Sequence, residues 1–338
     1  MPESLDSVSF PVLIGDIGGT NARFAVIADA TAPLERLADA RTAEYATIED
    51  AIEAVFAGRS GPRPKTALLA VAGPIAGDEV DLTNCDWIVT PKRLIALFQF
   101  DDVVLINDFE AQALALPDLG PGDIDPIGGG SIQPDKTRVV VGPGTGLGAG
   151  ALVHGGNHWI PVPGEGGHID LAPITARDFA IWPHIETIDG RVSGETLLCG
   201  SGIVRLYKAI CATDGVRPAH YEPAEVTAHG LSGADRQTKE TLELFAAYLG
   251  QHAGNLALIF MPRGGVYLAG GIPTKIAPAL HTGAFRKAFI EKAPHEALLD
   301  TFVTAIITKP DAALSGIAAF ARRPDRFEMD LTGRRWRG

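Results

Sequence analysis

The sequence predicts an α/β protein of two domains, and three observations carry this prediction. The chain has 338 residues, enough for about two domains with sizeable cores. Short apolar runs alternate with amphipathic stretches of helical length, which is typical of α/β proteins. A glycine-rich turn between two apolar runs occurs twice, near Gly15 and again near Gly144. The repetition indicates duplicated halves that face each other across a cleft.

The expected strands are runs of β-branched and small apolar residues at 12–14, 22–27, 67–72, 103–106, 139–141, 266–269 and 303–308. Helix start signals lie between them. Thr47 is the expected N-cap of a helix over 48–56, and Pro91 opens one that runs to residue 98. Apolar spacing over 235–260 predicts one long helix or a pair of helices. Residues 311–320 have a helical pattern after a strand, and sequence alone leaves open whether this tail packs back on the first domain.

Each glycine turn is predicted to form the tip of a β-hairpin. Glycine allows a positive φ there and lets backbone N–H groups approach an anion. The hydroxyls of Thr20 and Thr145 can add hydrogen bonds to phosphate oxygens. One such turn has an ordinary structural explanation, but two in one chain predict nucleotide binding.

Two common phosphate motifs do not explain the pattern. The sequence contains no run of the P-loop type, with its Gly-Lys-Ser/Thr ending. Residues 144–149 match the looser dinucleotide pattern, but that fingerprint requires a helix to begin on the glycines. Another apolar run and then Gly155-Gly156 follow instead, so the sequence favours a strand there.

Composition limits the partners and the compartment. The chain is 46% hydrophobic and 21% charged, with a net charge of −12, which argues for a globular protein and against nucleic-acid binding. No apolar run is long enough for a membrane span, so no membrane partner is expected. The three cysteines are odd in number and far apart in the sequence, which predicts neither disulfides nor a zinc cluster. We therefore expect a cytoplasmic protein.

Three further groups of residues are candidates for ligand contacts. Asn107 and Asp108 follow a buried strand, where ligands gather in open α/β sheets; alternatively, Asp108 is only the N-cap of the next helix. Glu165 and His168 lie three residues apart in a glycine-rich loop and can serve one polyhydroxy ligand as acceptor and donor; the alternative is a solvated Glu and a structural His. Gly270-Gly271 ends a strand, where a flat base or ribose can lie on bare backbone, unless it is only a strand-to-helix turn.

In this order, these motifs resemble those of the bacterial glucokinase family, the ATP-dependent hexokinase-like branch of the sugar kinase and actin-like ATPase superfamily. The resemblance covers nearly the whole chain. The matching segments are Gly15-Asp16-Ile17-Gly18-Gly19-Thr20-Asn21-Ala22-Arg23, Ala72-Gly73-Pro74-Ile75, Ile106-Asn107-Asp108-Phe109, Gly142-Pro143-Gly144-Thr145-Gly146-Leu147-Gly148, Pro163-Gly164-Glu165-Gly166-Gly167-His168, Val192-Ser193-Gly194-Glu195 and Leu268-Ala269-Gly270-Gly271-Ile272.

The resemblance implies a two-domain actin-like ATPase (ribonuclease H-like) fold with an interdomain cleft. The implied small domain is 1–109 plus 310–338, and the large domain is 110–309. The implied reaction is transfer of a phosphoryl group from MgATP to the 6-hydroxyl of D-glucose by a homodimer. Two alternatives stay open: a kinase for another hexose, and a non-catalytic ATP-binding protein of the actin type.

Carried over position by position, the resemblance also implies residue roles. Asp108 is the implied general base, and Asp16 helps to hold Mg²⁺. The implied ligands of the sugar hydroxyls are Asn107, Glu165, His168 and Glu195. The implied phosphate loops are Gly15, Asp16, Ile17, Gly18, Gly19 and Thr20 together with Gly144, Thr145 and Gly146, and Gly270 and Gly271 lie against the nucleoside. Many relatives carry a cysteine-rich zinc motif after the segment that ends at His168; this chain does not, which places it with the zinc-free members.

Overall fold

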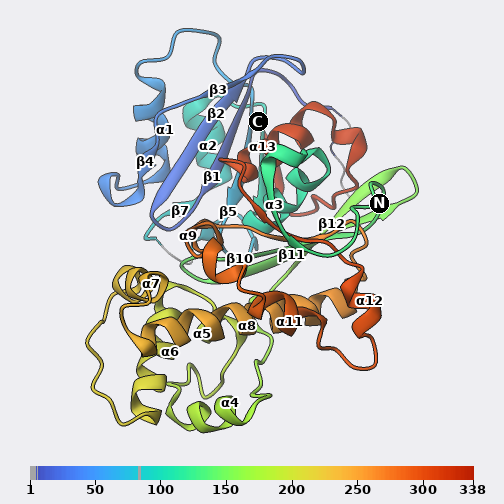
Figure 1. Ribbon diagram of the computed structural model, residues 1–338. Coiled ribbons are helices and arrows are strands. Elements are labelled where there is room, and N and C mark those ends of the chain that lie inside the picture. The colour runs from blue at the N-terminus through green and yellow to red at the C-terminus, as the bar shows by residue number, and fades with distance from the viewer. Residues whose placement is uncertain (1–4, 6, 83–84) are drawn as a thin grey trace. The chain divides into compact units, whose positions relative to one another are not determined.

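The computed structural model describes residues 5, 7–82 and 85–338, and these form two compact units (Figure 1). The first unit comprises the chain up to Leu119 together with Ala151–Pro163 and Pro310–Gly338. The second comprises Gly120–Gly150 and Gly164–Lys309. The tail after residue 310 therefore belongs to the first unit. The expected domain division between residues 109 and 110 stays a prediction; the compact units keep the helix at 108–115 whole.

A mixed sheet forms the centre of the first unit, in the order β15-β8-β5-β1-β2-β3 with β4 also on β2. The hairpin of β1 and β2 is antiparallel and pairs Val12 with Ile27, as the first glycine turn predicts. β5 and β8 continue from β1 in parallel. The strands are β1 (Val12–Ile17), β2 (Asn21–Ile27), β3 (Leu34–Arg36), β4 (Ala40–Arg41), β5 (Thr66–Val71), β8 (Asp102–Asn107) and β15 (Arg335–Arg337), with a separate pair β6 (Val80–Asp81) and β7 (Ile88–Val89).

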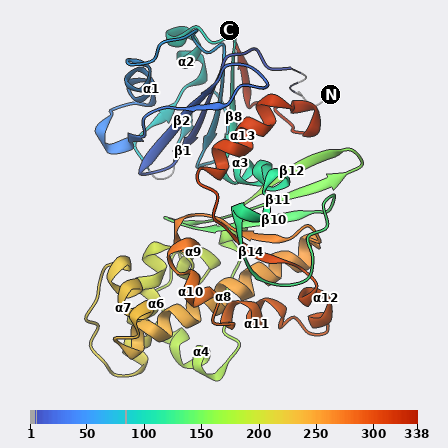
Figure 2. The ribbon, with the colours of Figure 1, turned by 45° about the horizontal axis from the view of Figure 1, so that its top comes forward.

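Helices cover both faces of this sheet (Figure 2). Alternate strand residues such as Leu13, Leu69 and Leu105 are fully buried in one cluster with α1 (Ile48–Phe56) and α2 (Pro91–Phe98). On the other face lie α3 (Asp108–Ala115) and α13 (Ala312–Arg322), which pack on each other and on β5. The expected cap of α1 is confirmed, because the Thr47 side chain accepts a hydrogen bond from the Asp50 N–H at 3.2 Å.

The second unit has a sheet in which β10, β13 and β14 are parallel and β9 is antiparallel to β14. The bounds are β9 (Ile124–Gly128), β10 (Arg138–Pro143), β13 (Val266–Leu268) and β14 (Thr304–Ile307). Two further strands, β11 (Leu147–Gly155) and β12 (His158–Gly164), carry the chain from one unit to the other and back. The second glycine turn therefore leads into a strand, as expected, and not into a helix.

One long helix, α8 (Arg236–Phe260), forms the core of the second unit, which settles the choice between one helix and two. α6 (Gly200–Thr213), α7 (Pro223–Ser232) and α11 (Ala284–Ile290) pack against it. Shorter helices complete the unit: α4 (Ala176–Ile181), α5 (Gly194–Leu197), α9 (Gly271–Lys275), α10 (Ala277–Leu280) and α12 (Glu296–Asp300).

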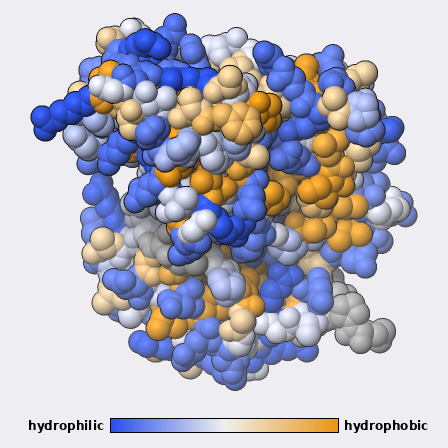
Figure 3. All heavy atoms as spheres, turned by 90° about the horizontal axis from the view of Figure 1, so that it is seen from below, coloured by the Kyte–Doolittle hydropathy of each residue, from blue (hydrophilic) through white to orange (hydrophobic). Residues whose placement is uncertain are grey.

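The surface seen in Figure 3 is hydrophilic over much of its margin, with apolar side chains gathered in its middle and to one side. Within the described residues, no helix is both long enough and apolar enough to span a membrane.

Candidate functional site

The carboxyl ends of three parallel strands meet at one edge of the first unit's sheet. Strand pairing places Ile17 of β1 beside Val71 of β5, and Val71 beside Asn107 of β8. The residues that follow therefore lie at the same edge: the first glycine turn from Gly18 after β1 and, two strands away, the start of α3 at Asp108 after β8. Ligands gather at such edges in open α/β sheets.

The first glycine turn is held by backbone and hydroxyl contacts. The Gly18 N–H donates to the Asn21 carbonyl at 3.0 Å, and the Thr42 hydroxyl donates to the Gly19 carbonyl at 2.7 Å. The expectation of positive φ is wrong for Gly15, Gly18, Gly144 and Gly146, none of which has one. At Gly15 the need is steric instead, because a Cβ there would lie 2.7 Å from the Leu69 Cδ2.

Asp16 is the acidic residue of the first turn and forms part of a charged cluster. Its carboxylate lies 3.4 Å from Arg23, which also approaches Asp311 at 3.6 Å, and Arg36 contacts Asp311 at 3.1 Å. Burial raises the pKa of Asp16, and the charge of Arg23 partly opposes this. A nearby cation would offset the free-energy cost of burying this carboxylate in its charged form. Mg²⁺ often takes only one or two protein carboxylates, with water and phosphate as its other ligands, so Asp16 fits the ion.

At the start of α3 the cap is Asn107, so the alternative interpretation of Asp108 as N-cap is wrong. The Asn107 Oδ1 accepts from the Phe109 and Glu110 N–H groups at 2.9 and 3.3 Å, and the Glu110 carboxylate accepts from the Asn107 N–H at 3.0 Å. This is a complete capping box. Asp108 is the first helical residue, and its Oδ1 accepts from the Phe109 N–H at 3.0 Å. Its carboxylate is therefore not required as the cap.

In the second unit, Glu195 is bonded directly to the second glycine turn. Its Oε2 accepts from the Leu147 N–H at 2.8 Å. A Cβ on Gly146 would lie 2.5 Å from the same oxygen, so only glycine leaves room for this carboxylate. The Gly144 carbonyl accepts from the Gly200 N–H at 2.9 Å, which joins the turn to the start of α6.

Glu165 and His168 lie on a short turn that packs against Leu147, the first residue of β11. The Glu165 Oε2 and the His168 Nε2 are 3.9 Å apart, and both side chains are exposed. Between them, a Cβ on Gly167 would clash with the Leu147 carbonyl, while the Gly194 N–H donates to the Ile169 carbonyl at 2.8 Å. The turn at 165–168 is thus packed against Leu147, next to the segment that carries Glu195.

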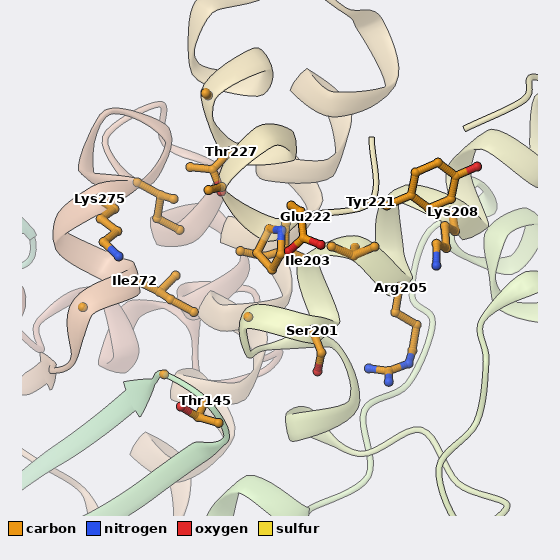
Figure 4. Close-up of a pocket in the computed structure, with 18 of the residues that line it drawn as sticks. Thr145, Ser201, Ile203, Arg205, Lys208, Tyr221, Glu222, Thr227, Ile272 and Lys275 are labelled. Atoms are coloured by element: carbon orange, nitrogen blue, oxygen red, sulfur yellow. The ribbon is translucent and has the colours of Figure 1, made fainter. Parts of the chain in front are cut away.

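A cavity of about 1140 Å³ opens beside the second glycine turn, entirely within the second unit (Figure 4). Gly144 and Thr145 line one end together with Ser201 at the start of α6. Gly271 also lines it, at the start of α9. Apolar walls suited to a flat ring come from Ile203, Val204, Pro223, Leu231, Ile272 and Ile276.

Three cations also line this cavity, and sequence reasoning missed all of them. Arg205 donates to the Thr196 carbonyl at 2.6 Å, Lys208 lies 5.3 Å from the centre of the Tyr221 ring, and Lys275 belongs to α9. Arg205, Lys208 and Lys275 are labelled in Figure 4. No single motif joins them in the sequence, because Arg205 and Lys208 lie on α6 whereas Lys275 lies on α9.

Gly270 is the one predicted site glycine that needs its conformational freedom. Its φ is +86°, and a Cβ would lie 2.9 Å from the Pro143 carbonyl oxygen. The strand-to-helix turn and the nucleoside contact are therefore compatible, since this turn brings Gly271 to the cavity.

The chain has two α/β units, each with a glycine turn, and one of these turns opens onto a cavity of nucleotide size. These features define the class of sugar kinases with the actin-like ATPase fold. The glucokinase family model matches residues 13–324, and the chain belongs to this family. The glucokinase of Agrobacterium fabrum is 54% identical over 339 residues, covering all of both chains.

Solved structures agree with this assignment. The crystal structure of a glucokinase from an Antarctic psychrotroph has a TM-score of 0.82 at 32% identity, covering 93% of this chain and 100% of that one. A ROK family glucokinase from Streptomyces griseus, solved with glucose and AMPPNP, has a TM-score of 0.61 at 21% identity, with coverage of 93% and 100%. The predicted family and fold are confirmed.

Proposed function

We propose that this chain transfers the γ-phosphoryl group of MgATP to the 6-hydroxyl of D-glucose, with Asp108 as the general base. Identity of 54% to a full-length glucokinase supports the reaction. The observation that carries the proposal is the bond from Glu195 to the Leu147 N–H. This hydrogen bond connects Glu195, an implied sugar ligand, to the glycine turn that lines the nucleotide-sized cavity.

ATP is the proposed occupant of this cavity. The apolar walls around Ile203 and Ile272 suit the adenine ring, and Gly271 leaves its backbone uncovered. At the other end, Thr145 and Ser201 offer hydroxyls to phosphate oxygens. Gly144 and Gly146 let the phosphates approach the backbone. The family resemblance assigns phosphate binding to the first turn, from Gly15 to Thr20, as well.

Mg²⁺ would be held by Asp16 and would neutralise the charge on the phosphates. The sugar would be fixed by hydrogen bonds to Asn107, Glu165, His168 and Glu195. The Asn107 Oδ1 is occupied by the cap, so its side-chain amide offers the sugar its N–H donors. Such positioning supplies most of the rate in phosphoryl transfer.

Asp108 would accept the proton of the 6-hydroxyl as the new phosphate ester forms. General-base assistance of this kind is worth about 10²–10⁴-fold. Its position at the edge where β1, β5 and β8 end, which also carries the first glycine turn, supports this role.

The glucokinase family match disfavours the two alternatives. Another hexose would use the same machinery, while an actin-type ATP-binding protein would need the phosphate turns but not Glu165, His168 and Glu195. The predicted homodimer, the cytoplasmic location and the absence of nucleic-acid and membrane partners also stay proposals.

A coupled assay of ADP release over a panel of sugars tests the function. We expect turnover of MgATP only with D-glucose, because a site built to pair sugar hydroxyls discriminates strongly between analogues. Equal or faster turnover with fructose or N-acetylglucosamine would identify another hexose kinase. ADP release without any sugar would favour the actin-type alternative.

A further inference from the structure

The C-terminal segment from Phe327 to Gly338 is built into the first unit, although the family match ends at residue 324. Its strand β15 runs antiparallel to β8 and pairs Arg335 with Val104. The Leu105 N–H donates to the Arg334 carbonyl at 2.9 Å. Leu331 is fully buried. The segment is therefore fastened along the strand that ends at Asn107.

Arg334 reaches from this segment to the capping box of α3. Its Nη1 donates to the Glu110 Oε2 at 2.6 Å, and the Glu110 side chain is 1% exposed. The same carboxylate oxygen accepts from the Asn107 N–H. Arg334 is itself held, because its Nε donates to the Asp330 carbonyl at 3.0 Å. A continuous chain of hydrogen bonds thus joins Asp330, Arg334, Glu110 and Asn107.

We propose that Arg334 is a positioning residue for phosphoryl transfer: it holds the Glu110 carboxylate in place, and Glu110 fixes the backbone from which Asn107 and Asp108 project. This inference rests on the proposed role of Asp108. A buried carboxylate that loses its cation partner takes up a proton or moves toward water. Either change alters the acceptor of the Asn107 N–H, and with it the start of α3. A small displacement of a catalytic group can lower the rate by about 10²-fold.

The chain offers a matched control on the same segment. Arg335 also forms a partly buried ion pair, with its Nε and Nη2 2.8 and 3.0 Å from the two carboxylate oxygens of Asp102. Asp102 is the first residue of β8, at the opposite end from Asn107. The ion pair between Arg335 and Asp102 therefore holds the segment against the start of β8, at a distance from the capping box.

The test compares Arg334→Met, Arg334→Lys and Arg335→Met in the full-length protein, assayed well below every melting temperature. We expect Arg334→Met to lower kcat by about 10- to 100-fold, with the KM for MgATP nearly unchanged. The loss should be smaller in Arg334→Lys, which keeps the charge. Arg335→Met should lower the melting temperature and leave kcat close to the wild-type value. Equal losses of kcat in Arg334→Met and Arg335→Met would overturn the proposal.

A double-mutant cycle separates positioning from general stabilisation. Because Arg334 acts through Asp108, Arg334→Met should lower kcat little further in a protein that already carries Asp108→Asn. Two losses that multiply would show that Arg334 does not act through Asp108. If Arg334→Met does not fold, Arg334→Lys takes its place in the same cycle, with the same two outcomes. High activity of Asp108→Asn alone would instead refute the proposed role of Asp108 as the base. That result can be told apart from a failure of the Arg334 proposal, which the comparison of Arg334→Met with Arg335→Met tests.

Discussion

Acid should destabilise this protein through His252. This residue lies on α8 and is fully buried, and neither ring nitrogen has a hydrogen-bond partner among the described residues. Burial lowers the pKa of His252 to about 4, with a smaller contribution from the charge of Lys292. The unfolded chain has an ordinary histidine pKa of about 6.5. Below that pH, His252 is protonated in the unfolded state but stays neutral in the folded state until the pH approaches 4.

The sign and size follow from this difference in pKa. The stabilisation is complete above pH 6.5 and is lost as the pH falls toward 4. The whole gap corresponds to roughly 3 kcal/mol, of which about 2.5 kcal/mol is lost by pH 4.5. His252→Phe retains a ring of similar size without the titrating group, so its stability should not carry this contribution.

Urea unfolding followed by circular dichroism, at several pH values between 7.5 and 4.5, measures the effect. The difference in unfolding free energy between the wild type and His252→Phe should shift by about 2.5 kcal/mol in favour of the variant as the pH falls. The same substitution at the exposed His184 is the control and should not produce the shift. Parallel loss of stability in the wild type and His252→Phe would refute the reasoning.

Three further predictions concern catalysis. Asp108→Asn should lower kcat by about 10²-fold or more while glucose still binds by calorimetry; since Asn107 is the cap, the melting temperature should hardly change. More than roughly a third of the wild-type kcat would show that Asp108 is not the base. Gly146→Ala should lower kcat/KM because its Cβ meets the Glu195 carboxylate at 2.5 Å, whereas Gly144→Ala has open space and should do less; equal effects would contradict this. Activity should vanish with EDTA and return with Mg²⁺, and turnover that persists in EDTA would exclude the metal role of Asp16.

The sequence predicted those parts of the fold that local patterns control. The first hairpin, the cap of α1 by Thr47 and the strand before Asn107 follow from apolar period and capping chemistry. The sequence analysis considered Asp108 as the cap of α3, whereas the cap is Asn107. Both residue types cap well, and the choice depends on Glu110 closing the box from inside the helix.

Local sequence patterns could not predict the nucleotide-sized cavity. Its lining comes from the second glycine turn and from α6, α7 and α9, so residues such as Ser201, Thr227 and Lys275 meet only after the second unit has folded. Arg334 was missed for a similar reason, because its partner Glu110 lies 224 residues earlier in the chain.

The glycine turns show why recognising a motif differs from explaining it. Positive φ, the usual reason for glycine in a tight turn, applies to none of Gly15, Gly18, Gly144 and Gly146. Gly15 is needed because β1 packs closely against Leu69, and Gly146 because Glu195 occupies the space of a side chain. The second requirement joins two segments that are far apart in the sequence. A substitution at Gly146 therefore acts on the proposed phosphate turn and the proposed sugar ligand together, whereas one at Gly144 acts on the turn alone.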